Sequence, residues 1–188
     1  SPNVTDIVEM AGAAEKGGDG GASQPSRVSE TNVQVEEIDE PDIIKTNGES
    51  IFYSPDSYYN DKTKVIDSLP IENLSITSEI DKKGKLLLKD DMLIVIPERY
   101  GDKEVYGFDI SDPSSPEQKW EIEINGSVAG ARLYNDQIYM VLQDRVDYND
   151  PCPIRPMTIG GEGITVRCTD IYYPSKPVQT DVTYTAVS

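Results

Sequence analysis

Residues 42–53 read DIIKTNGESIFY, and two later stretches of the chain repeat this pattern. GKLLLKDDMLIV begins at Gly84 and GARLYNDQIYMV begins at Gly130, so the copies follow one another at offsets of 42 and 46 residues. Each copy holds a short apolar strand, a polar two-residue turn and a second strand rich in β-forming residues. The pattern therefore predicts a β-hairpin that recurs along the chain.

A second element recurs in phase with the first. The Asp109-Ile110 dipeptide and the Asp170-Ile171 dipeptide are both followed by two prolines that stand three residues apart. Their offset of 61 residues predicts an insertion of about fifteen residues in the third unit, within a loop over residues 143–163. A strand-only repeat of about 40–50 residues is typical of a β-propeller blade.

The sequence divides into a tail and three repeat units. Residues 1–30 include the stretch AGAAEKGGDGGASQPS, which predicts a flexible, acidic linker rich in Gly, Ala and Ser. The predicted blades span residues 31–82, 83–128 and 129–188. Strands of the third unit are expected near residues 130–133, 137–144, 164–171 and 181–187. We therefore predict an all-β fold, a β-propeller of four-stranded blades.

The number of blades creates a problem for such a fold. Propellers close with about four to eight blades, whereas this chain supplies about three. A terminal blade with no neighbour would leave an apolar sheet face exposed. The chain is thus expected to be part of an incomplete propeller or a fragment. The remaining blades would come from the same longer polypeptide or from another chain.

Composition restricts the classes of partner and of chemistry. With 17 Lys and Arg against 34 Asp and Glu, the net charge is −17, which disfavours nucleic acid and anionic membrane surfaces and suits solubility or cationic partners. No apolar run is long enough to be a transmembrane segment. The chain contains no histidine, which excludes Ser-His-Asp catalysis and His-ligated metals from it.

Two cysteines, Cys152 and Cys168, flank the long loop of the third unit. A disulfide between them would close about 17 residues and contribute about 3 kcal/mol on the chain-entropy model. The alternative is a pair of buried free thiols in a cytosolic protein. A disulfide would indicate an oxidising compartment and an exported protein. Glycosylation-type triplets at Asn73 and Asn125, with a third at Asn3, point the same way.

The opening of the repeat region resembles a known family. TNVQV at residues 31–35 and DEPDIIKTNG at residues 39–48 are similar to the stretch that opens the propeller in secreted β-propeller-domain proteins of archaea and some bacteria. Ile44 stands where Val is usual, and Asn47 stands where Asp is usual. The resemblance covers about residue 29 to the end of the chain. It implies a longer propeller, export and an N-terminal tether, and it implies no particular activity.

Candidate metal ligands lie just before the first inner strand. Asp39, Glu40 and Asp42 offer oxygen ligands of the kind that Ca²⁺ takes, and the alternative is a solvated or hydrogen-bonding turn shaped by Pro41. A second acidic loop, formed by Asp144, Asp147, Asn149 and Asp150, matches an EF-hand loop only at its start. Gly160 to Gly163 is expected to be a hairpin tip, because no helix follows to make a phosphate site.

The function expected from these features is a non-enzymatic one. We expect an extracellular or cell-surface β-propeller module that serves as a binding or structural scaffold for a protein or glycan ligand. No catalytic or cofactor-binding residue is assigned. The alternative is a carbohydrate-active hydrolase that uses channel carboxylates. Tyr58-Tyr59, Trp120 and Tyr172-Tyr173 would be a stacking surface in either case, or simply sheet packing. Acids that converge on one pocket would favour the hydrolase.

Overall fold

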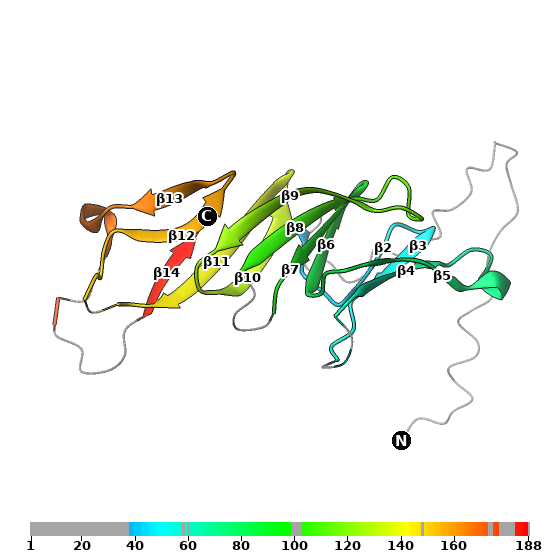
Figure 1. Cartoon of the computed structure of the whole chain (residues 1–188), viewed down its shortest axis with the longest axis horizontal. Helices are drawn as coiled ribbons and strands as arrows, with labels where there is room; N and C mark the ends of the chain where they lie inside the picture. The colour runs from blue at the N-terminus through cyan, green and yellow to red at the C-terminus, as the bar shows by residue number, and fades with distance from the viewer. Residues whose placement is uncertain are drawn as a thin grey trace, which may run out of the picture.

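The computed structural model describes residues 38–57, 59, 61–98, 103–147, 149–172, 175–176 and 183–187. Three antiparallel sheets form this part of the chain, and it contains no α-helix. Figure 1 shows the sheets side by side along the long axis of the molecule. The predicted all-β propeller architecture is confirmed. The tail over residues 1–30 lies outside the described residues.

We name the sheets blade 1, blade 2 and blade 3. Blade 1 consists of β2 (Ile44–Thr46), β3 (Ser50–Tyr53), β4 (Thr63–Asp67) and β5 (Ser75–Ile80). Blade 2 consists of β6 (Lys85–Lys89), β7 (Met92–Ile96), β8 (Glu104–Asp109), β9 (Glu117–Ile124), β12 (Ile154–Ile159) and β13 (Glu162–Val166). Blade 3 consists of β1 (Ile38–Asp39), β10 (Ser127–Tyr134), β11 (Gln137–Arg145) and β14 (Thr183–Val187). Two 3-10 turns, η2 (Ile71–Asn73) and η3 (Cys168–Asp170), lie in connections.

The three repeated stretches are the hairpins β2–β3, β6–β7 and β10–β11. Their turns need a left-handed backbone, which Gly48 adopts at φ 96° and which Asp90 and Asn135 each adopt at φ 49°. Gly, Asn and Asp are the residues that tolerate this conformation at a hairpin turn. The hairpins predicted from the repeat are therefore confirmed, turns included.

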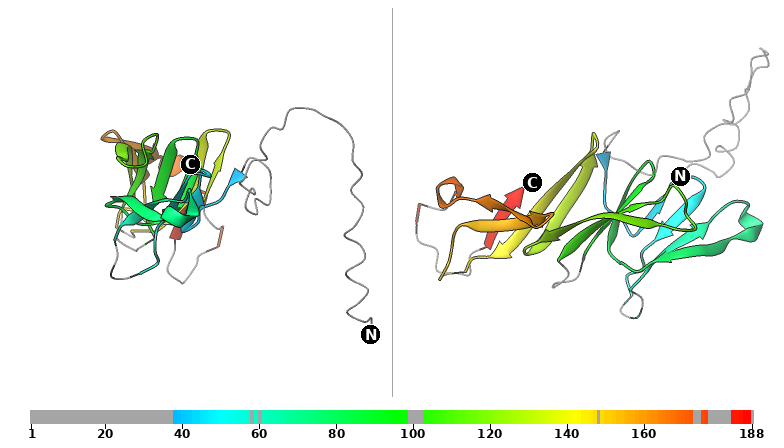
Figure 2. Two further views of the ribbon diagram at one scale, coloured as in Figure 1. Left: turned by 90° about the vertical axis from the view of Figure 1, so that its right-hand side faces the viewer. Right: turned by 45° about the horizontal axis from the view of Figure 1, so that its top comes forward.

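Blade 2 lies between blade 1 and blade 3, as the further views in Figure 2 also show. Its strands β6–β9 contribute side chains to a core on each face. One core packs Phe52, Val65 and Ile80 of blade 1 against one face of blade 2 (Leu86, Leu93, Val95, Phe108 and Ile110). The other core packs the opposite face of blade 2 (Leu87, Ile94, Ile96, Val105 and Ile124) against blade 3. Successive residues of a strand point to opposite faces, so the unbroken apolar run in β7 follows from this double burial.

The third unit differs from the prediction. The stretch expected to be its insertion contains β12, and β12 pairs with β9 of blade 2 rather than with blade 3. The strand expected near residues 164–171 ends at Val166, and Asp170 lies in η3. Pairing with β9 buries Met157 in the core shared by blades 2 and 3. The fourth strand of blade 3 is β1, from the opposite end of the described chain.

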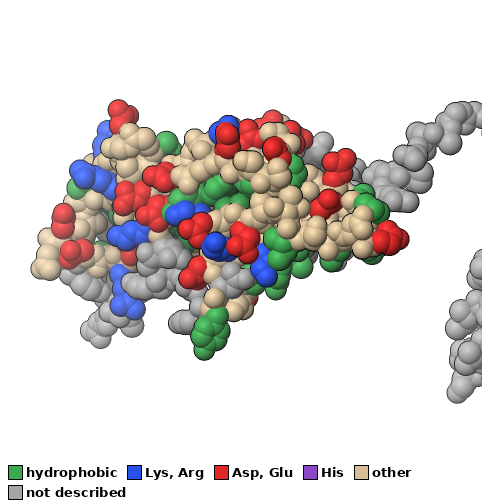
Figure 3. All heavy atoms as spheres, turned by 45° about the vertical axis from the view of Figure 1, so that its right-hand side comes forward, with side chains coloured by type: hydrophobic (Ala, Val, Ile, Leu, Met, Phe, Trp, Pro, Cys, Tyr) green, Lys and Arg blue, Asp and Glu red, His purple; other side chains and the backbone are tan. Residues whose placement is uncertain are grey.

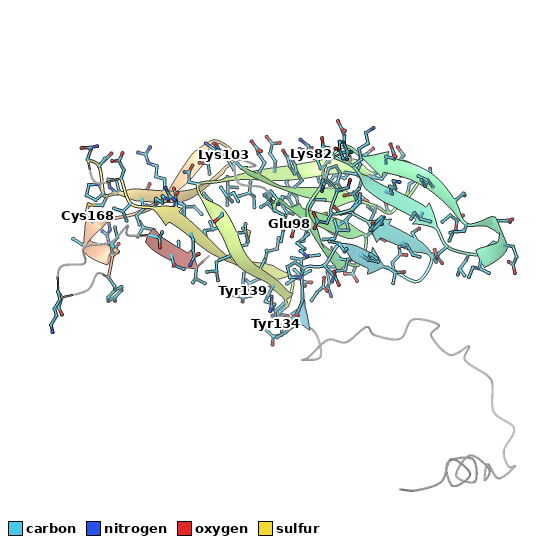
Figure 4. All side chains as sticks on the ribbon, turned by 90° about the horizontal axis from the view of Figure 1, so that it is seen from below. Lys82, Glu98, Lys103, Tyr134, Tyr139 and Cys168 are labelled. Atoms are coloured by element: carbon cyan, nitrogen blue, oxygen red, sulfur yellow. A yellow bond between two sulfur atoms is a disulfide. The ribbon has the colours of Figure 1, made fainter. Side chains whose placement is uncertain are left out.

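The outer faces of blades 1 and 3 carry exposed apolar side chains. On blade 1, Ile44 is 50% exposed and Ile76 is 53% exposed. On blade 3, Tyr134 and Tyr139 point out of the sheet and are each 43% exposed (Figure 4). Among the described residues no further sheet packs on either face. These are the two faces to which further blades would add.

The double burial of blade 2 yields a first prediction. Leu86→Ala and Leu87→Ala remove neighbouring side chains that enter different cores, and each is expected to lower the free energy of unfolding by about 2–5 kcal/mol. Leu74→Ala, at a site that is 57% exposed, should change it by less than about 0.5 kcal/mol. Urea unfolding measures all three. A small effect at either Leu86 or Leu87 would contradict burial of both faces.

Candidate functional site

A pocket opens where the β3–β4, β5–β6 and β7–β8 connections meet at one end of blades 1 and 2. Its volume is about 350 Å³. Two lysines, four acids, a tyrosine, a glycine and a proline line it, namely Lys82, Lys83, Asp61, Asp81, Glu98, Glu104, Tyr106, Gly84 and Pro97. We call it the Lys82 pocket. Figure 4 labels Lys82 and Glu98, which lie near each other in neighbouring connections.

A chain of polar contacts fixes Lys82. Its Nζ donates a hydrogen bond to the Tyr106 hydroxyl over 2.9 Å and lies 4.1 Å from the centroid of the same ring. The Tyr106 hydroxyl donates in turn to Glu104 Oε2 at 3.4 Å. The hydrogen bond with Tyr106, assisted by the charges of Glu104 and Asp81 and opposed by burial, raises the pKa of Lys82. Lys82 therefore stays an ammonium donor at neutral pH, which is unsuited to attack or proton abstraction.

The backbone of the β5–β6 connection positions both lysines. A Cβ on Gly84 would lie 1.9 Å from the Ile96 carbonyl oxygen, so only glycine lets this connection approach the end of β7. The buried Gly84 N–H donates to Ser54 Oγ at 3.0 Å. Lys83 Nζ donates to the Ser57 carbonyl. The sequence between β5 and β6 is thus held against the β3–β4 connection.

A second hollow continues the Lys82 pocket towards blade 3. Both hollows share Pro97 and Glu98, and the second, of about 320 Å³, reaches Lys85, Arg132 and Pro41. Glu98 Oε1 lies 3.5 Å from Lys85 Nζ at the boundary. The two hollows give this end of the molecule a polar depression that carries both signs of charge. Such a surface can bind hydroxyl-rich or charged ligands through several hydrogen bonds at once.

The residues predicted as calcium ligands make other contacts. Asp39 Oδ1 accepts a hydrogen bond from Lys45 Nζ, and its Oδ2 accepts one from the Leu88 N–H at 2.9 Å. Glu40 forms an ion pair with Arg132 of blade 3 at 2.9 Å. The Asp42 carboxylate accepts a hydrogen bond from the neighbouring Ile43 N–H at 2.7 Å.

These contacts belong to a segment that joins all three blades, which we call the inner segment (residues 38–46). Its β1 pairs with β10 of blade 3, and its β2 is the edge strand of blade 1. Between them, Asp42 exchanges two backbone hydrogen bonds with Leu86 of β6, at 3.0 and 2.7 Å. The acids at its centre thus hold the segment to the sheet edges. No three acids or cysteines gather as a metal-binding group in the described part of the chain, and calcium at Asp39, Glu40 and Asp42 stays a prediction.

The other predicted residues lie apart from the Lys82 pocket. Cys152 and Cys168 form a disulfide, which links the start of the β12–β13 hairpin to η3. Asn73 is exposed in η2, whereas the side-chain amide of Asn125 donates to the Arg155 carbonyl. Glycosylation at Asn73 and Asn125 stays a prediction. The geometry nevertheless makes Asn73 the more accessible acceptor of the two.

The acidic loop and the aromatic pairs also have separate places. Asp144 and Asp150 border a small hollow beside Asn125, and Asp147 caps the Asn149 N–H at 2.8 Å. Gly160 and Gly161 form the β12–β13 turn at positive φ, so the predicted hairpin tip is confirmed. Tyr59 and Tyr172 are fully exposed. Tyr58, Tyr173 and Asn3 lie outside the described residues.

Sequence reasoning missed Lys82, Tyr106 and Glu104. Lys82 and Lys83 stand in a connection, and Tyr106 stands in a strand whose alternation suggests packing alone. Lys82 and Tyr106 are 24 positions apart in the sequence and meet only because blade 1 packs on blade 2. No local spacing indicates such a contact.

In the described part of the chain, no helix has the length and apolarity needed to cross a bilayer.

Comparison with known proteins relates the chain to one family. A family model described as "Beta propeller domain" matches residues 28–188. An uncharacterized protein of Archaeoglobus fulgidus is 42% identical over 173 residues, which are 87% of this chain and 27% of that protein. An uncharacterized protein of Methanocaldococcus jannaschii is 36% identical over 134 residues, which are 71% of this chain and 20% of that protein. The chain thus spans about a quarter of the length of these curated relatives. No solved structure matches it.

A second prediction concerns the inner segment. Asp39→Ala leaves the Leu88 N–H without its acceptor and removes the carboxylate partner of Lys45, and it should lower the free energy of unfolding by about 1–3 kcal/mol. The matched change Asp42→Ala loses one exposed contact to its own neighbour and should cost less than about 1 kcal/mol. Urea unfolding compares the two variants. If instead calcium raises the melting temperature of the wild type and of neither variant, these acids bind the metal.

Proposed function

Because this chain belongs to the β-propeller domain family, we propose that it is a binding module of a larger propeller, exported to the cell surface or beyond. In this proposal the Lys82 pocket and the hollow beside it bind a protein or glycan ligand. The module positions the ligand and performs no chemistry on it.

One observation carries the proposal: Lys82 is fixed as a cation by Tyr106, inside a pocket built from connections of two blades and the start of β8. Side chains that are already held in place lose little conformational entropy when a ligand arrives. The raised pKa of Lys82 argues for recognition rather than nucleophilic chemistry. Connections on a rigid sheet scaffold are also where binding residues usually occur.

Export is supported by two features of the chain. A disulfide is most often found in proteins of oxidising compartments. The net charge of −17 suits solubility outside the cell and attracts cationic partners. Figure 3 shows acidic side chains spread over the face in view, interspersed with basic ones.

The same proposal assigns the outer faces of blades 1 and 3 to further blades. The relatives are about four and about five times as long as the matched regions, which is ample sequence for additional blades of about 40–50 residues. We therefore propose that the missing blades come from the same polypeptide. The apolar side chains of these faces, such as Ile76 and Val187, would then be buried as the corresponding residues of blade 2 are.

A hydrolase remains the second candidate, because four carboxylates converge on one pocket. Asp61, Asp81 and Glu98 come from three different connections, Glu104 begins β8, and all four line the Lys82 pocket. Paired carboxylates are what glycoside hydrolysis requires. Lys82 and Lys83 also line the pocket, so it carries charge of both signs, which favours binding of a charged or hydroxyl-rich ligand.

Binding is tested by screening glycan and peptide arrays with the native chain. Any ligand found is expected to bind at least about tenfold more weakly to Tyr106→Phe, which removes the hydroxyl that positions Lys82. Tyr139→Phe provides the control, because it removes a hydroxyl on the outer face of blade 3. Equal loss in both variants, or none in Tyr106→Phe, would place the ligand elsewhere.

Catalysis is tested with a panel of polysaccharides incubated with the native chain. The binding proposal expects no release of reducing sugar above that of a blank without protein. A hydrolase would release sugar, and its turnover should fall by about a hundredfold or more in Glu98→Gln or Glu104→Gln. The control variant Glu79→Gln should keep that turnover. This result would overturn the non-enzymatic proposal in favour of the hydrolase.

A further inference from the structure

A second pocket lies at the opposite end of the strands from the Lys82 pocket, between blades 2 and 3. Its volume is about 490 Å³. It is bordered by the β6–β7 turn, the end of β8, the middle of β9 and the β10–β11 turn. Both blades that form it are present in the chain, so it does not depend on further blades. We call it the Trp120 pocket.

The floor of this pocket is apolar and aromatic. Met92, Ile94, Leu133 and Ile138 lie beneath it, and Trp120 forms one wall. Trp120 pairs across the sheet with Gly107, where a Cβ would lie 2.0 Å from the indole Cε2. The missing side chain lets the indole lie against the β8 backbone. A flat aromatic surface beside aliphatic side chains is typical of a ligand pocket of this size.

The rim of the pocket carries four aspartates, three from blade 2 and one from blade 3. Asp90 and Asp136 stand on the adjacent hairpin turns of blades 2 and 3, and Lys89 lies 3.9 and 3.7 Å from them. Asp109 lies 3.3 Å from Lys119. Asp91 forms no ion pair with any residue in the described part of the chain. The rim therefore holds more negative than positive charge.

The surface ion pairs on this rim are weak enough to be exchanged. The side chains of Lys89, Asp90 and Asp136 are 51%, 83% and 77% exposed, and exposed pairs at such distances contribute about 0–1 kcal/mol. An incoming cation would thus meet little competition. Asp109 is different, because the Ser111 hydroxyl and N–H hold its pKa below the ordinary value and keep it ionised.

We infer that the Trp120 pocket binds an arginine side chain of a basic peptide segment. The guanidinium plane stacks on the Trp120 indole, the aliphatic part covers Met92 and Ile138, and the charged end meets Asp91 and Asp136. Arginine fits better than lysine because its flat guanidinium both stacks on aromatic rings and bridges carboxylates. This site goes beyond the ligand site at Lys82, and the net charge of −17 would speed the approach of such a partner.

Trp120 is the one tryptophan of the chain, so its fluorescence reports on this pocket directly. Titration of the native chain with a tetra-arginine peptide should change the emission saturably. Tetra-lysine should bind more weakly, and tetra-glutamate should have no effect. Asp91→Asn with Asp136→Asn should weaken tetra-arginine binding by about tenfold. Asn suits the left-handed backbone of position 136, so the turn should be kept.

The matched control is the double variant Asp56→Asn with Glu72→Gln. It also removes two negative charges, but from exposed sites far along the chain from this pocket. It should change the affinity by less than about twofold. Equal weakening in the control would show binding to net charge alone and would overturn the inference. Three other results would also overturn it. They are a change in Trp120 emission that does not saturate with peptide, tetra-lysine binding as tight as tetra-arginine binding, and a saturable emission change caused by cello-oligosaccharides without the peptide. Tyr106→Phe should leave tetra-arginine binding unchanged, which separates this site from the Lys82 pocket.

Discussion

Blade 2 is covered on both faces, and the rest of the structure is arranged around that burial. Leu86 and Leu87 are adjacent in β6, and each is fully buried in a different core. A sheet covered on one face only would let one of them be polar. Because each core also contains residues of a neighbouring blade, the three sheets are fixed relative to one another by apolar packing. Both pockets lie at the ends of these packed interfaces.

The inner segment pairs with backbone groups at the open sheet edges. The edge strand β6 would otherwise present unpaired N–H and C=O groups. Asp42 pairs with Leu86 through the backbone, and the Asp39 carboxylate accepts from the Leu88 N–H. The ion pairs of Asp39 and Glu40 then hold the segment in register. Of the three residues predicted as calcium ligands, Asp39 and Asp42 satisfy groups of this edge, and calcium binding there stays a prediction.

Local signals in the sequence were sufficient for some elements and not for others. The hairpin turns at Gly48, Asp90 and Asn135 were predictable, because turn chemistry is local. The β12–β13 hairpin was assigned to the wrong unit, since its alternation is compatible with any sheet edge and only the packing of Met157 selects blade 2. The same limit applies to the Lys82 pocket, whose members come from three separate connections and from β8.

The sequence alone determined the all-β fold, the repeated hairpins, the cysteine pair that can close a loop and the absence of histidine chemistry. These properties depend on composition and on periods of a few residues, which the chain carries locally. Only the tertiary structure decided that Tyr106 fixes Lys82, that Gly107 makes room for Trp120, and that the first strand completes the third blade. Each of these contacts joins residues that are distant in sequence or lie on different strands, and the packing of the blades brings them together.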